Sequence, residues 1–327
     1  MNGGNAKISL LFLSLVLTVV ALFTWGFYYP KNLKIVSSSN LEKDLNSDVS
    51  ILLVGDIMLD RNVRNIIDKK GFDYFFKGVN DLVKNVDISV ANLEGPFTNY
   101  PSITSDLKNK ELKFTFDPSL APALADLGFD VMGLANNHTL NFGYSGLETT
   151  RRYIGSSGMI YYGDPLNKDE ISTIITKNNI SIGFIGFHEF SYLNFNRVFE
   201  EIISMRSKVD FLIVSPHWGV EYDSSPTPKM REWAHEFIDY GADAVVGSHP
   251  HVIGEVEDYN GKRIYYSLGN FAFDQYFSPE TMKGLALIVH LHKSNVRTEV
   301  SYKEIPVSVG KQGVSIYCHE DVCPPAF

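Results

Sequence analysis

Length, charge and composition narrow the class of protein before any motif is considered. The chain has 327 residues, and 29 Lys and Arg against 38 Asp and Glu give a net charge of −9 at pH 7. This acidic balance lacks the positive excess that binding to a phosphate backbone requires, so nucleic acid is excluded as a partner. Hydrophobic residues at 44% and charged residues at 20% exclude a disordered chain.

The N-terminal segment is predicted to span a membrane. No charged residue occurs from Ile8 to Tyr29, and about 20 apolar residues are enough to cross a bilayer as a helix. Trp25 and Tyr28 lie near its far end, where amphipathic rings favour the lipid headgroups. We therefore expect an uncleaved transmembrane helix within residues 1–30, with a cleaved signal peptide as the alternative.

Three further regions follow this segment. We expect a flexible linker over 31–48, one globular domain over 49–310 and a C-terminal tail over 311–327. The tail contains both cysteines of the chain, Cys318 and Cys323, which could form a disulfide outside the cytoplasm or stay as two unpaired thiols. The disulfide mildly favours an extracytoplasmic body, whereas the charges beside the apolar segment do not decide its orientation.

Within the domain, short apolar runs alternate with amphipathic stretches, which predicts an α/β fold with strands inside and helices outside. Strands are predicted at Ile51–Val54, Ile88–Ala91, Val131–Ala135, Ile182–Phe187, Phe211–Val214, Ala244–Val246 and Ile264–Tyr266. Helices are predicted at 118–127, 145–157, 196–207 and 228–240. For the first of these helices we expect Asp117 as the N-cap and Pro118 as the first helical residue.

Polar side chains follow six of the predicted strands. They are Asp56, then Asn92 and Glu94, then Asn136, Asn137 and His138, then His217, then His249 and His251, and finally Asn270. Because ligands bind beyond the carboxyl ends of strands in open α/β sheets, these residues are expected to converge on a single site. Carboxylate, amide and imidazole ligands suit Mn²⁺, Zn²⁺ or Fe better than Mg²⁺ or Ca²⁺.

Two such ions need a bridging carboxylate, for which Glu94 is the candidate. A pair of ions about 3.5–4 Å apart can clamp a phosphoryl group during hydrolysis. Singly, each residue also has a structural interpretation: Asp56 could cap a helix, Glu94 could lie in a turn, and His217 could be a core histidine. The pattern His249-Pro250-His251 is the sharpest, because proline fixes the backbone between two imidazoles.

Some polar residues outside this set are weaker candidates. His188 ends a predicted strand and could line the site. Arg61 could reach a substrate anion or form a surface ion pair. The segment 99–112 could shape substrate choice or be an ordinary surface loop. The remaining histidines are interpreted as structural or solvated: His235, His290, His292 and His319.

As an ordered set, these motifs resemble the CapA-type capsule (poly-γ-glutamate) biosynthesis proteins, whose domain is related to the calcineurin-like metallophosphoesterases. The resemblance runs from about Ile51 to Leu287. It rests on Gly55-Asp56-Ile57-Met58 with Arg61, Asn92-Leu93-Glu94, Ala135-Asn136-Asn137-His138, His217-Trp218-Gly219, Gly247-Ser248-His249-Pro250-His251 and Ser267-Leu268-Gly269-Asn270-Phe271. It implies a four-layer α/β/β/α sandwich with the site at the strand ends.

The resemblance also implies a role for each site residue. The metal ligands would be Asp56 and His251 on one ion, Asn137, His217 and His249 on a second ion, and Glu94 between the two. His138 would act as the acid at the leaving oxygen, a role that suits an unperturbed pKa near 6.5; Arg61 would be a second catalytic residue. Substrate would be contacted by Asn92, Asn136 and Asn270. Two positions depart from the related phosphoesterases: Met58 replaces a His after the first Asp, and Asn141 replaces an Asp after the Asn-Asn-His element.

Two classes of function follow from the resemblance and the site chemistry. The first is an assembly role, in which a single-pass, extracytoplasmic protein of the cell membrane helps to synthesise, export or attach a poly-γ-glutamate capsule. Its partners would be the capsule polymer and the membrane subunits of a polymer synthase. The second is a metal-dependent phosphoesterase that hydrolyses a phosphate ester or diester of the cell envelope. The sequence leaves open whether the protein is an enzyme.

Overall fold

The computed structural model describes residues 47–106, 111–191, 194–295 and 297–316. The apolar segment from Ile8 to Tyr29, most of the linker and the two cysteines lie outside the described residues. Among the described residues, no helix combines the length and apolar character needed to cross a bilayer. The expected transmembrane helix therefore stays a prediction.

The first sheet has eight strands, and its centre is β1 (Ser47–Ile57). β1 pairs in parallel with β2 (Ile88–Leu93) and, near its end, with β11 (Asn270–Ala272). Its other neighbour, β12, is antiparallel. The remaining strands of this sheet are β3 (Val131–Gly133), β4 (Ile160–Tyr162), β12 (Lys283–Lys293), β13 (Thr298–Gly310) and β14 (Gly313–Ile316).

The second sheet has six strands in the order β5-β6-β7-β8-β10-β9. Its four inner strands, β6, β7, β8 and β10, run parallel. The strands are β5 (Ser172–Lys177), β6 (Ile180–His188), β7 (Phe211–His217), β8 (Ala244–Val246), β9 (Val256–Tyr259) and β10 (Lys262–Tyr265).

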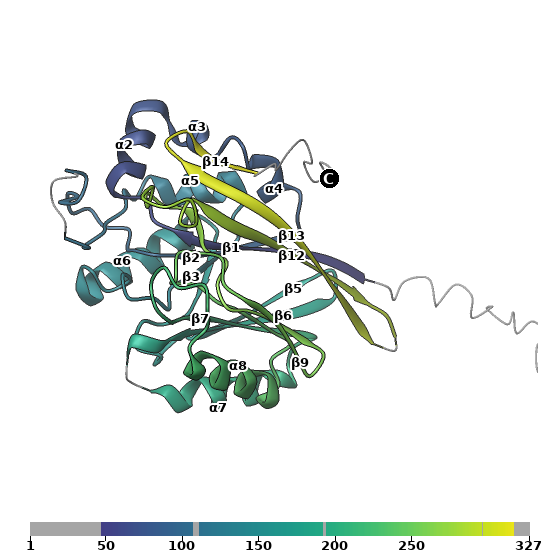
Figure 1. Ribbon diagram of the computed structural model, residues 1–327. Helices are drawn as coiled ribbons and strands as arrows, with labels where there is room; N and C mark the ends of the chain where they lie inside the picture. Colours follow the sequence, from purple (N-terminus) through teal and green to yellow (C-terminus); the bar gives the residue numbers. More distant parts are fainter. Residues whose placement is uncertain (1–46, 107–110, 192–193, 296, 317–327) are drawn as a thin grey trace, which may run out of the picture. The chain divides into compact units, whose positions relative to one another are not determined.

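Helices lie on the outer faces of both sheets (Figure 1). One group packs on the first sheet: α2 (Arg61–Lys70), α3 (Phe72–Phe76), α4 (Asn80–Lys84), α5 (Leu120–Leu127) and α6 (Gly143–Ser156). The other group, α7 (Phe195–Arg206) and α8 (Pro228–Tyr240), packs on the second sheet. A short 3₁₀ turn, η2 (Glu189–Ser191), follows β6.

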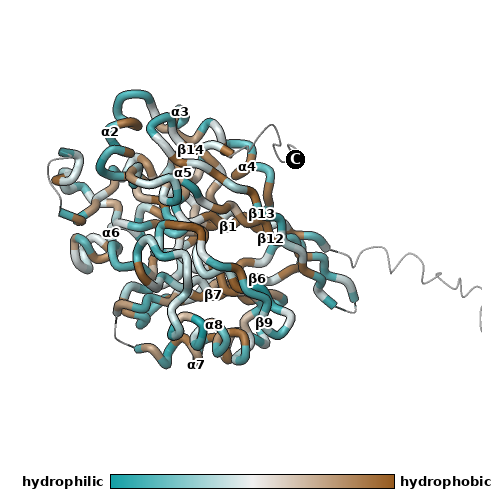
Figure 2. Tube along the Cα trace, in the orientation of Figure 1, coloured by the Kyte–Doolittle hydropathy of each residue, from teal (hydrophilic) through white to brown (hydrophobic). Residues whose placement is uncertain are grey.

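Side chains of β1 point alternately to its two faces, so this strand contributes to two separate hydrophobic clusters. Ile51 and Leu53 contribute to a hydrophobic cluster between the sheets, while Leu52 and Val54 contribute to a second cluster under the first group of helices. Successive strand residues point to opposite faces, so a central strand covered on both sides is apolar throughout. A third cluster lies under α7 and α8. The hydrophobic colouring of Figure 2 is strong along the strands that face these clusters.

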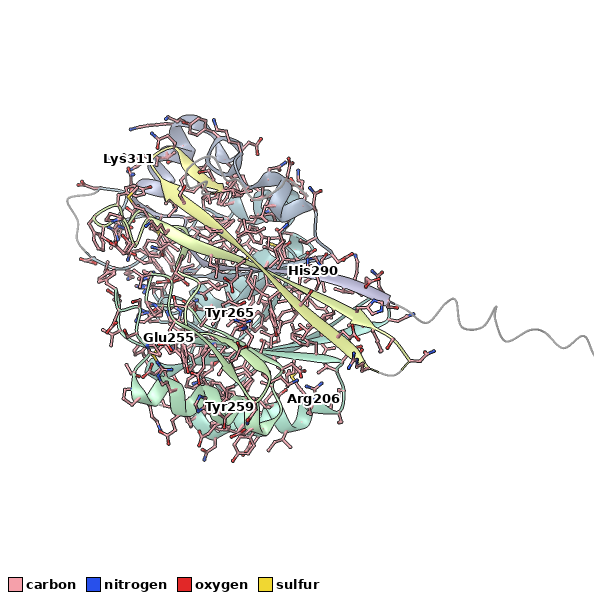
Figure 3. All side chains as sticks on the ribbon, turned by 45° about the vertical axis from the view of Figure 1, so that its right-hand side comes forward. Arg206, Glu255, Tyr259, Tyr265, His290 and Lys311 are labelled. Carbon is pink, nitrogen blue, oxygen red and sulfur yellow. The ribbon has the colours of Figure 1, made fainter. Side chains whose placement is uncertain are left out.

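The two sheets are also joined by a polar contact. The hydroxyl of Tyr265 in β10 donates a hydrogen bond to Glu304 in β13 over 2.9 Å, and its ring lies 6.1 Å from that of Tyr302. Figure 3 shows Tyr265 in the middle of the molecule, between the layers of strands. The two sheets are therefore joined by hydrogen bonding as well as by apolar packing.

Each of the seven predicted strands and four predicted helices corresponds to an element of the structure, which confirms a mixed α/β fold with two sheets. The predicted start of the first helix is wrong. Its N-cap is Ser119, because Asp117 instead accepts hydrogen bonds from the backbone N–H and hydroxyl of Ser119 and so closes a turn before α5. The first sheet also continues beyond residue 310, through β14 to Ile316.

A close approach of two backbones places the end of β1 against the loop before β11. Gly55 packs so tightly there that an added Cβ would lie 1.8 Å from the carbonyl oxygen of Gly269. That oxygen accepts a hydrogen bond from the backbone N–H of Asp56 over 3.1 Å, and Asn270 is brought into register with Asp56. Gly269 has a φ of +70°, which a residue without Cβ adopts at little cost.

We predict that Gly55→Ala lowers the free energy of unfolding by about 1–3 kcal/mol or more, because overpacking a rigid site forces the backbone apart. Gly155→Ala is the matched control, since Gly155 lies in α6 with nothing within 4 Å of its added Cβ. That change is expected to stabilise by about 0.5–1 kcal/mol. Denaturant unfolding of the purified chain measures both, and equal effects would contradict the prediction.

Candidate metal centre

The predicted site residues converge where the parallel strands of both sheets end. Asp56 lies near the end of β1, Asn92 lies in β2, and His217 is the last residue of β7. A backbone bridge between His217 and Ser248 brings the loop after β8 beside β7. The two sheets meet at this point: Nδ2 of Asn92, in the first sheet, lies 3.4 Å from Nδ1 of His217, in the second sheet.

The first group of potential ligands is Asp56, Glu94 and His251, whose ligand atoms lie within 4.8 Å of one another. Nδ1 of His251 is 3.2 Å from Oδ2 of Asp56, and Nε2 of the same ring is 3.6 Å from Oε1 of Glu94. All three side chains are buried. The structure thus brings together the residues predicted for one metal position and its bridge.

Glu94 is the most unusual member of this group. It is 0% exposed, and neither of its carboxylate oxygens has a hydrogen-bond partner among the described residues. Burial raises the pKa of Glu94 well above its usual value, against the opposing effect of His251. A buried carboxylate without partners is costly, and a bound cation is one of the few groups that can compensate it.

His251 and Glu94 together retain a proton in the metal-free protein. Burial alone would lower the pKa of His251, but the charges of Glu94 and Asp56 outweigh it and raise that pKa to about 9. Because metal ligands must be deprotonated, binding of a cation here would release this proton.

The second group is formed by Asn137, His217 and His249. Nε2 of His217 lies 2.9 Å from Oδ1 of Asn137 and 3.1 Å from Nδ1 of His249. Two ligands bound to one ion at ~2.0–2.1 Å lie about 3 Å apart, so these separations match a coordination site. Burial, with the neighbouring imidazoles, lowers the pKa of His249 to about 3 and that of His217 well below its usual value. Both rings are therefore neutral, as metal binding requires.

The backbone of the His249-Pro250-His251 segment is held in an unfavourable conformation. His249 has a φ of +99° and His251 a φ of +59°, a region that residues with a Cβ rarely adopt. The N–H of His249 points to Oδ2 of Asp56 over 3.3 Å, and Nδ1 of His251 lies 3.0 Å from Oδ1 of Asn270. Such strain is typical of functional sites, where surrounding contacts fix it.

His138 lies beside this cluster, and its environment differs from the expectation. Its Nε2 is 3.9 Å from Oε1 of Glu94, and its Nδ1 is 3.1 Å from Oδ1 of Asn141. The ring packs on Phe114 with centroids 4.3 Å apart. Burial lowers the pKa of His138 to about 4 instead of leaving it near 6.5. The ring is therefore neutral at neutral pH in the metal-free protein, and its role as an acid stays a prediction.

Arg61 begins α2 in a left-handed conformation, with a φ of +55°. Its Nε lies 3.3 Å from Oδ2 of Asp274, a nearly buried carboxylate that also accepts the backbone N–H of Asn62. The side chain of Arg61 is 29% exposed. The ion pair that the sequence offered as an alternative is present, and it leaves the guanidinium partly open to solvent.

The three asparagines predicted to contact substrate make many contacts within the protein. Asn92 donates to Asp56 over 2.8 Å and accepts from Asn136 over 3.0 Å. Asn136 is fully buried, and its oxygen accepts the backbone N–H groups of His138 and Thr139. Asn270 is also fully buried, between His251 and the carbonyl of Thr281. They position the ligands, and their contact with substrate stays a prediction.

One candidate ligand was missed in the sequence. Glu221 forms a group with His249 and His251 whose ligand atoms lie within 4.8 Å of one another. It is half-buried and follows the His217-Trp218-Gly219 motif by two residues. That short spacing was the available signal, but only the turn after β7 places the carboxylate over the site. Met58, in contrast, is buried in the hydrophobic cluster beneath the helices, and its sulfur accepts the N–H of Asp60.

Of the histidines that were weaker candidates, His188 lies beside the site, and the others described lie away from it. His188 is buried at the end of β6, paired in register with His217, and their ring centroids are 6.0 Å apart. His235 binds Glu257 over 2.7 Å, and His292 binds Asp48 over 2.7 Å, both away from the site. His290 is an exposed residue of β12 (Figure 3).

The segment 99–112 was predicted to lie near the site or to be an ordinary surface loop. The described part of this segment is anchored by the buried Asp60, which accepts hydrogen bonds from the hydroxyls of Ser102 and Thr104. Beyond it, the backbone N–H of Phe114 donates to Asn141, the partner of His138. The chain just after the segment therefore reaches the site, while residues 107–110 lie outside the described residues.

The fold and this cluster together define a two-sheet α/β protein with potential metal ligands at its strand ends. Residues 50–275 match the model of the family described as "Bacterial capsule synthesis protein PGA_cap". The chain belongs to this family, which confirms the resemblance given by the motifs.

Two relatives from Bacillus are similar over most of the chain. "Capsule biosynthesis protein CapA" of Bacillus anthracis is 30% identical over 255 residues, which cover 70% of this chain and 61% of that protein. "PGA biosynthesis protein CapA" of Bacillus subtilis is 32% identical over 281 residues, which cover 79% and 72%. The matched region thus spans less than two thirds of the Bacillus anthracis protein.

One solved structure supports the fold. A hypothetical protein from Thermus thermophilus has a TM-score of 0.51 and 15% sequence identity, and the match covers 78% of this chain and 98% of that one. At this identity the likeness shows the arrangement of strands and helices alone.

We predict that Glu94→Gln changes the stability of the metal-free protein little, because the loss of a buried carboxylate without a hydrogen-bond partner among the described residues offsets the loss of its ion pair with His251. The same change is expected to abolish most of the stabilisation by added Mn²⁺ or Zn²⁺, which for the wild type reaches about 2.7 kcal/mol at an ion concentration 100 times Kd. Melting curves with and without metal measure both effects. Glu148→Gln, on the exposed face of α6, is the control, and a full metal response in Glu94→Gln would contradict the prediction.

Proposed function

We propose that this chain takes part in the synthesis, export or attachment of a poly-γ-glutamate-like capsule, as a membrane-anchored extracytoplasmic protein whose strand-end cluster holds two divalent ions. The observation that carries the proposal is the group of Asp56, Glu94 and His251 beside a second group of Asn137, His217 and His249, in a chain that belongs to a capsule synthesis family. The ions would be Mn, Zn or Fe, given the mixture of carboxylate, amide and imidazole ligands.

The residues present fit this metal centre. Glu94 is buried with both oxygens unpartnered among the described residues, Asp56 and His251 lie beside it, and the second group has ligand atoms about 3 Å apart. Asp56 and His251 would hold one ion and Asn137, His217 and His249 the other, with Glu94 between them. Glu221 adds a carboxylate at the exposed side.

The same site favours a second candidate function, hydrolysis of a phosphate ester or diester of the cell envelope. Divalent ions supply Lewis-acid chemistry when bound: they activate water and offset the negative charge of phosphoryl oxygens. In hydrolysis, the oxygen of water forms a new bond to phosphorus, the ester P–O bond breaks, and a proton passes to the leaving oxygen. An array of neutral imidazoles around a buried carboxylate is suited to that chemistry.

His138 and Arg61 are the residues of the chain proposed to act on substrate. Asn141 accepts the Nδ1 proton of His138, so Nε2 is the atom that faces the cluster. An anionic substrate near this ring would favour its protonated form, which can then protonate the leaving oxygen. Arg61, held by Asp274 at the start of α2, would contact an anionic oxygen through its partly exposed guanidinium.

The charge distribution argues against a basic groove as the way to hold a polyanion. The chain carries a net charge of −9, and Arg151 already contacts three carboxylates, those of Glu148, Asp164 and Glu170. Positive potential for a poly-γ-glutamate chain or a phosphate would therefore come from the bound ions and Arg61.

We predict Mn²⁺-dependent hydrolysis of a chromogenic phosphodiester, with kcat lowered about 10²–10⁴-fold in His138→Ala and with little change in KM. His290→Ala, on the exposed surface of β12, is the control. Full activity in His138→Ala would contradict the role of this residue. Metal binding without hydrolysis in the wild type would contradict the phosphoesterase function and leave the assembly role.

We predict that the full chain stays in the membrane fraction after an alkaline carbonate wash, because the segment from Ile8 to Tyr29 carries no charge. Two charges introduced by Leu15→Asp and Val19→Asp should release it, since each carboxylate is costly in the bilayer core. Protease added to intact protoplasts is expected to digest the body of the protein. Release of the wild type by the wash, or full protection of the body, would contradict the proposed location.

A further inference from the structure

His188 is a buried histidine beside the site that the proposed metal ligands do not include. It is 6% exposed, and its Nε2 atom has no hydrogen-bond partner among the described residues. Buried polar atoms without a partner are uncommon in folded proteins, and each one calls for an explanation such as a bound water or ion. In the site, the oxygens of Glu94 have this same property.

The loop before β5 is built to hold His188 in place. The side chain of Asn167 accepts the backbone N–H of His188 over 2.8 Å and donates to its carbonyl oxygen over 2.8 Å. Asn167 is itself buried, with a φ of +52°. Because this clamp uses only the backbone of His188, a change of its side chain leaves the clamp intact.

The ring of His188 has a defined tautomer. Its Nδ1 lies 2.8 Å from the carbonyl oxygen of Pro165. A carbonyl oxygen can only accept, so Nδ1 carries the proton, and Nε2 of the neutral ring presents a lone pair. Histidines that support metal ions commonly donate their other ring N–H to a backbone carbonyl in this way.

The ring of His188 lies on the His217 side of the cluster. His188 and His217 are paired residues of the parallel strands β6 and β7, so both side chains leave the same face of the sheet. Their ring centroids are 6.0 Å apart, and the ring of Phe190 packs against both His188 and His249. Nε2 of His188 has no hydrogen-bond partner in the described part of the chain, and the rings of His188 and His217 are 6.0 Å apart, so a small molecule such as water is needed to connect this atom to the cluster.

We propose that His188 supports the ion held by Asn137, His217 and His249 from outside its direct ligands, with Nε2 accepting a hydrogen bond from a water molecule in the shell of that ion. The inference rests on the proposed metal centre. It assigns an acceptor beside His217, at a residue outside the motifs that carry the family resemblance.

Zinc affinity of the purified full chain, measured by competition with a chromophoric chelator, tests this assignment. We expect His188→Ala to weaken one of the bound ions by about 10–100-fold, as is typical when a partner outside the direct ligands is removed. His188→Gln retains an acceptor oxygen and should recover part of the loss. His290→Ala, which removes an exposed histidine of β12, should bind zinc as the wild type does.

A second measurement needs neither metal nor a variant. Nuclear magnetic resonance of the metal-free chain with ¹⁵N-labelled histidine should show His188 protonated at Nδ1 and unprotonated at Nε2. A proton on Nε2, or unchanged zinc affinity in His188→Ala when the wild type binds zinc, would overturn the inference while leaving the metal centre intact. Failure of the wild type to bind zinc would overturn both, whereas zinc binding without phosphodiester hydrolysis would leave the role of His188 standing.

Discussion

The candidate site depends on one unfavourable interaction, the burial of the Glu94 carboxylate without a hydrogen-bond partner among the described residues. In water this group would be charged and solvated, so its burial is costly unless a positive charge lies against it. His251 supplies part of that charge by retaining a proton, at a distance of 3.6 Å. The neutral rings of His217 and His249 supply none, and their facing nitrogens lie 3.1 Å apart. A bound cation would supply the rest of that positive charge.

The rest of the fold keeps the side chains of the site in place despite the free-energy cost of burying Glu94. Parallel strands of two sheets end together, and Asn92 links them by contacting both Asp56 and His217. Gly55 lets the loop that carries Asn270 lie directly against β1, and Asn270 in turn contacts His251. The strained φ angles within the His249-Pro250-His251 segment persist because hydrogen bonds fix the segment from several directions. Apolar packing on both faces of β1 stabilises the fold and so offsets the free-energy cost of the buried charges and strained backbone of the site.

Much of the arrangement was predictable, because strand ends are marked by a change from apolar to polar residues. The motifs after β1, β2, β3, β7 and β8 could be predicted to meet, since parallel strands end at the same edge of a sheet. Three features required the structure. Ser119 displaced Asp117 as the helix cap through a local side-chain contact, Glu221 reached the site through a turn, and the pKa of His138 fell because of burial. Each depends on atomic contacts made in the folded chain, which spacing in the sequence does not record.

The metal content of the purified chain tests the central claim most directly. Protein prepared without chelator and reconstituted with Mn²⁺ or Zn²⁺ should hold about two equivalents of metal, as the proposed pair of ions bridged by Glu94 requires. The double variant His217→Ala/His249→Ala should lose at least one of them, because it removes both imidazoles of the second group. A wild-type protein that binds no metal after reconstitution would contradict the account and leave a capsule-family protein whose strand-end cluster has another use.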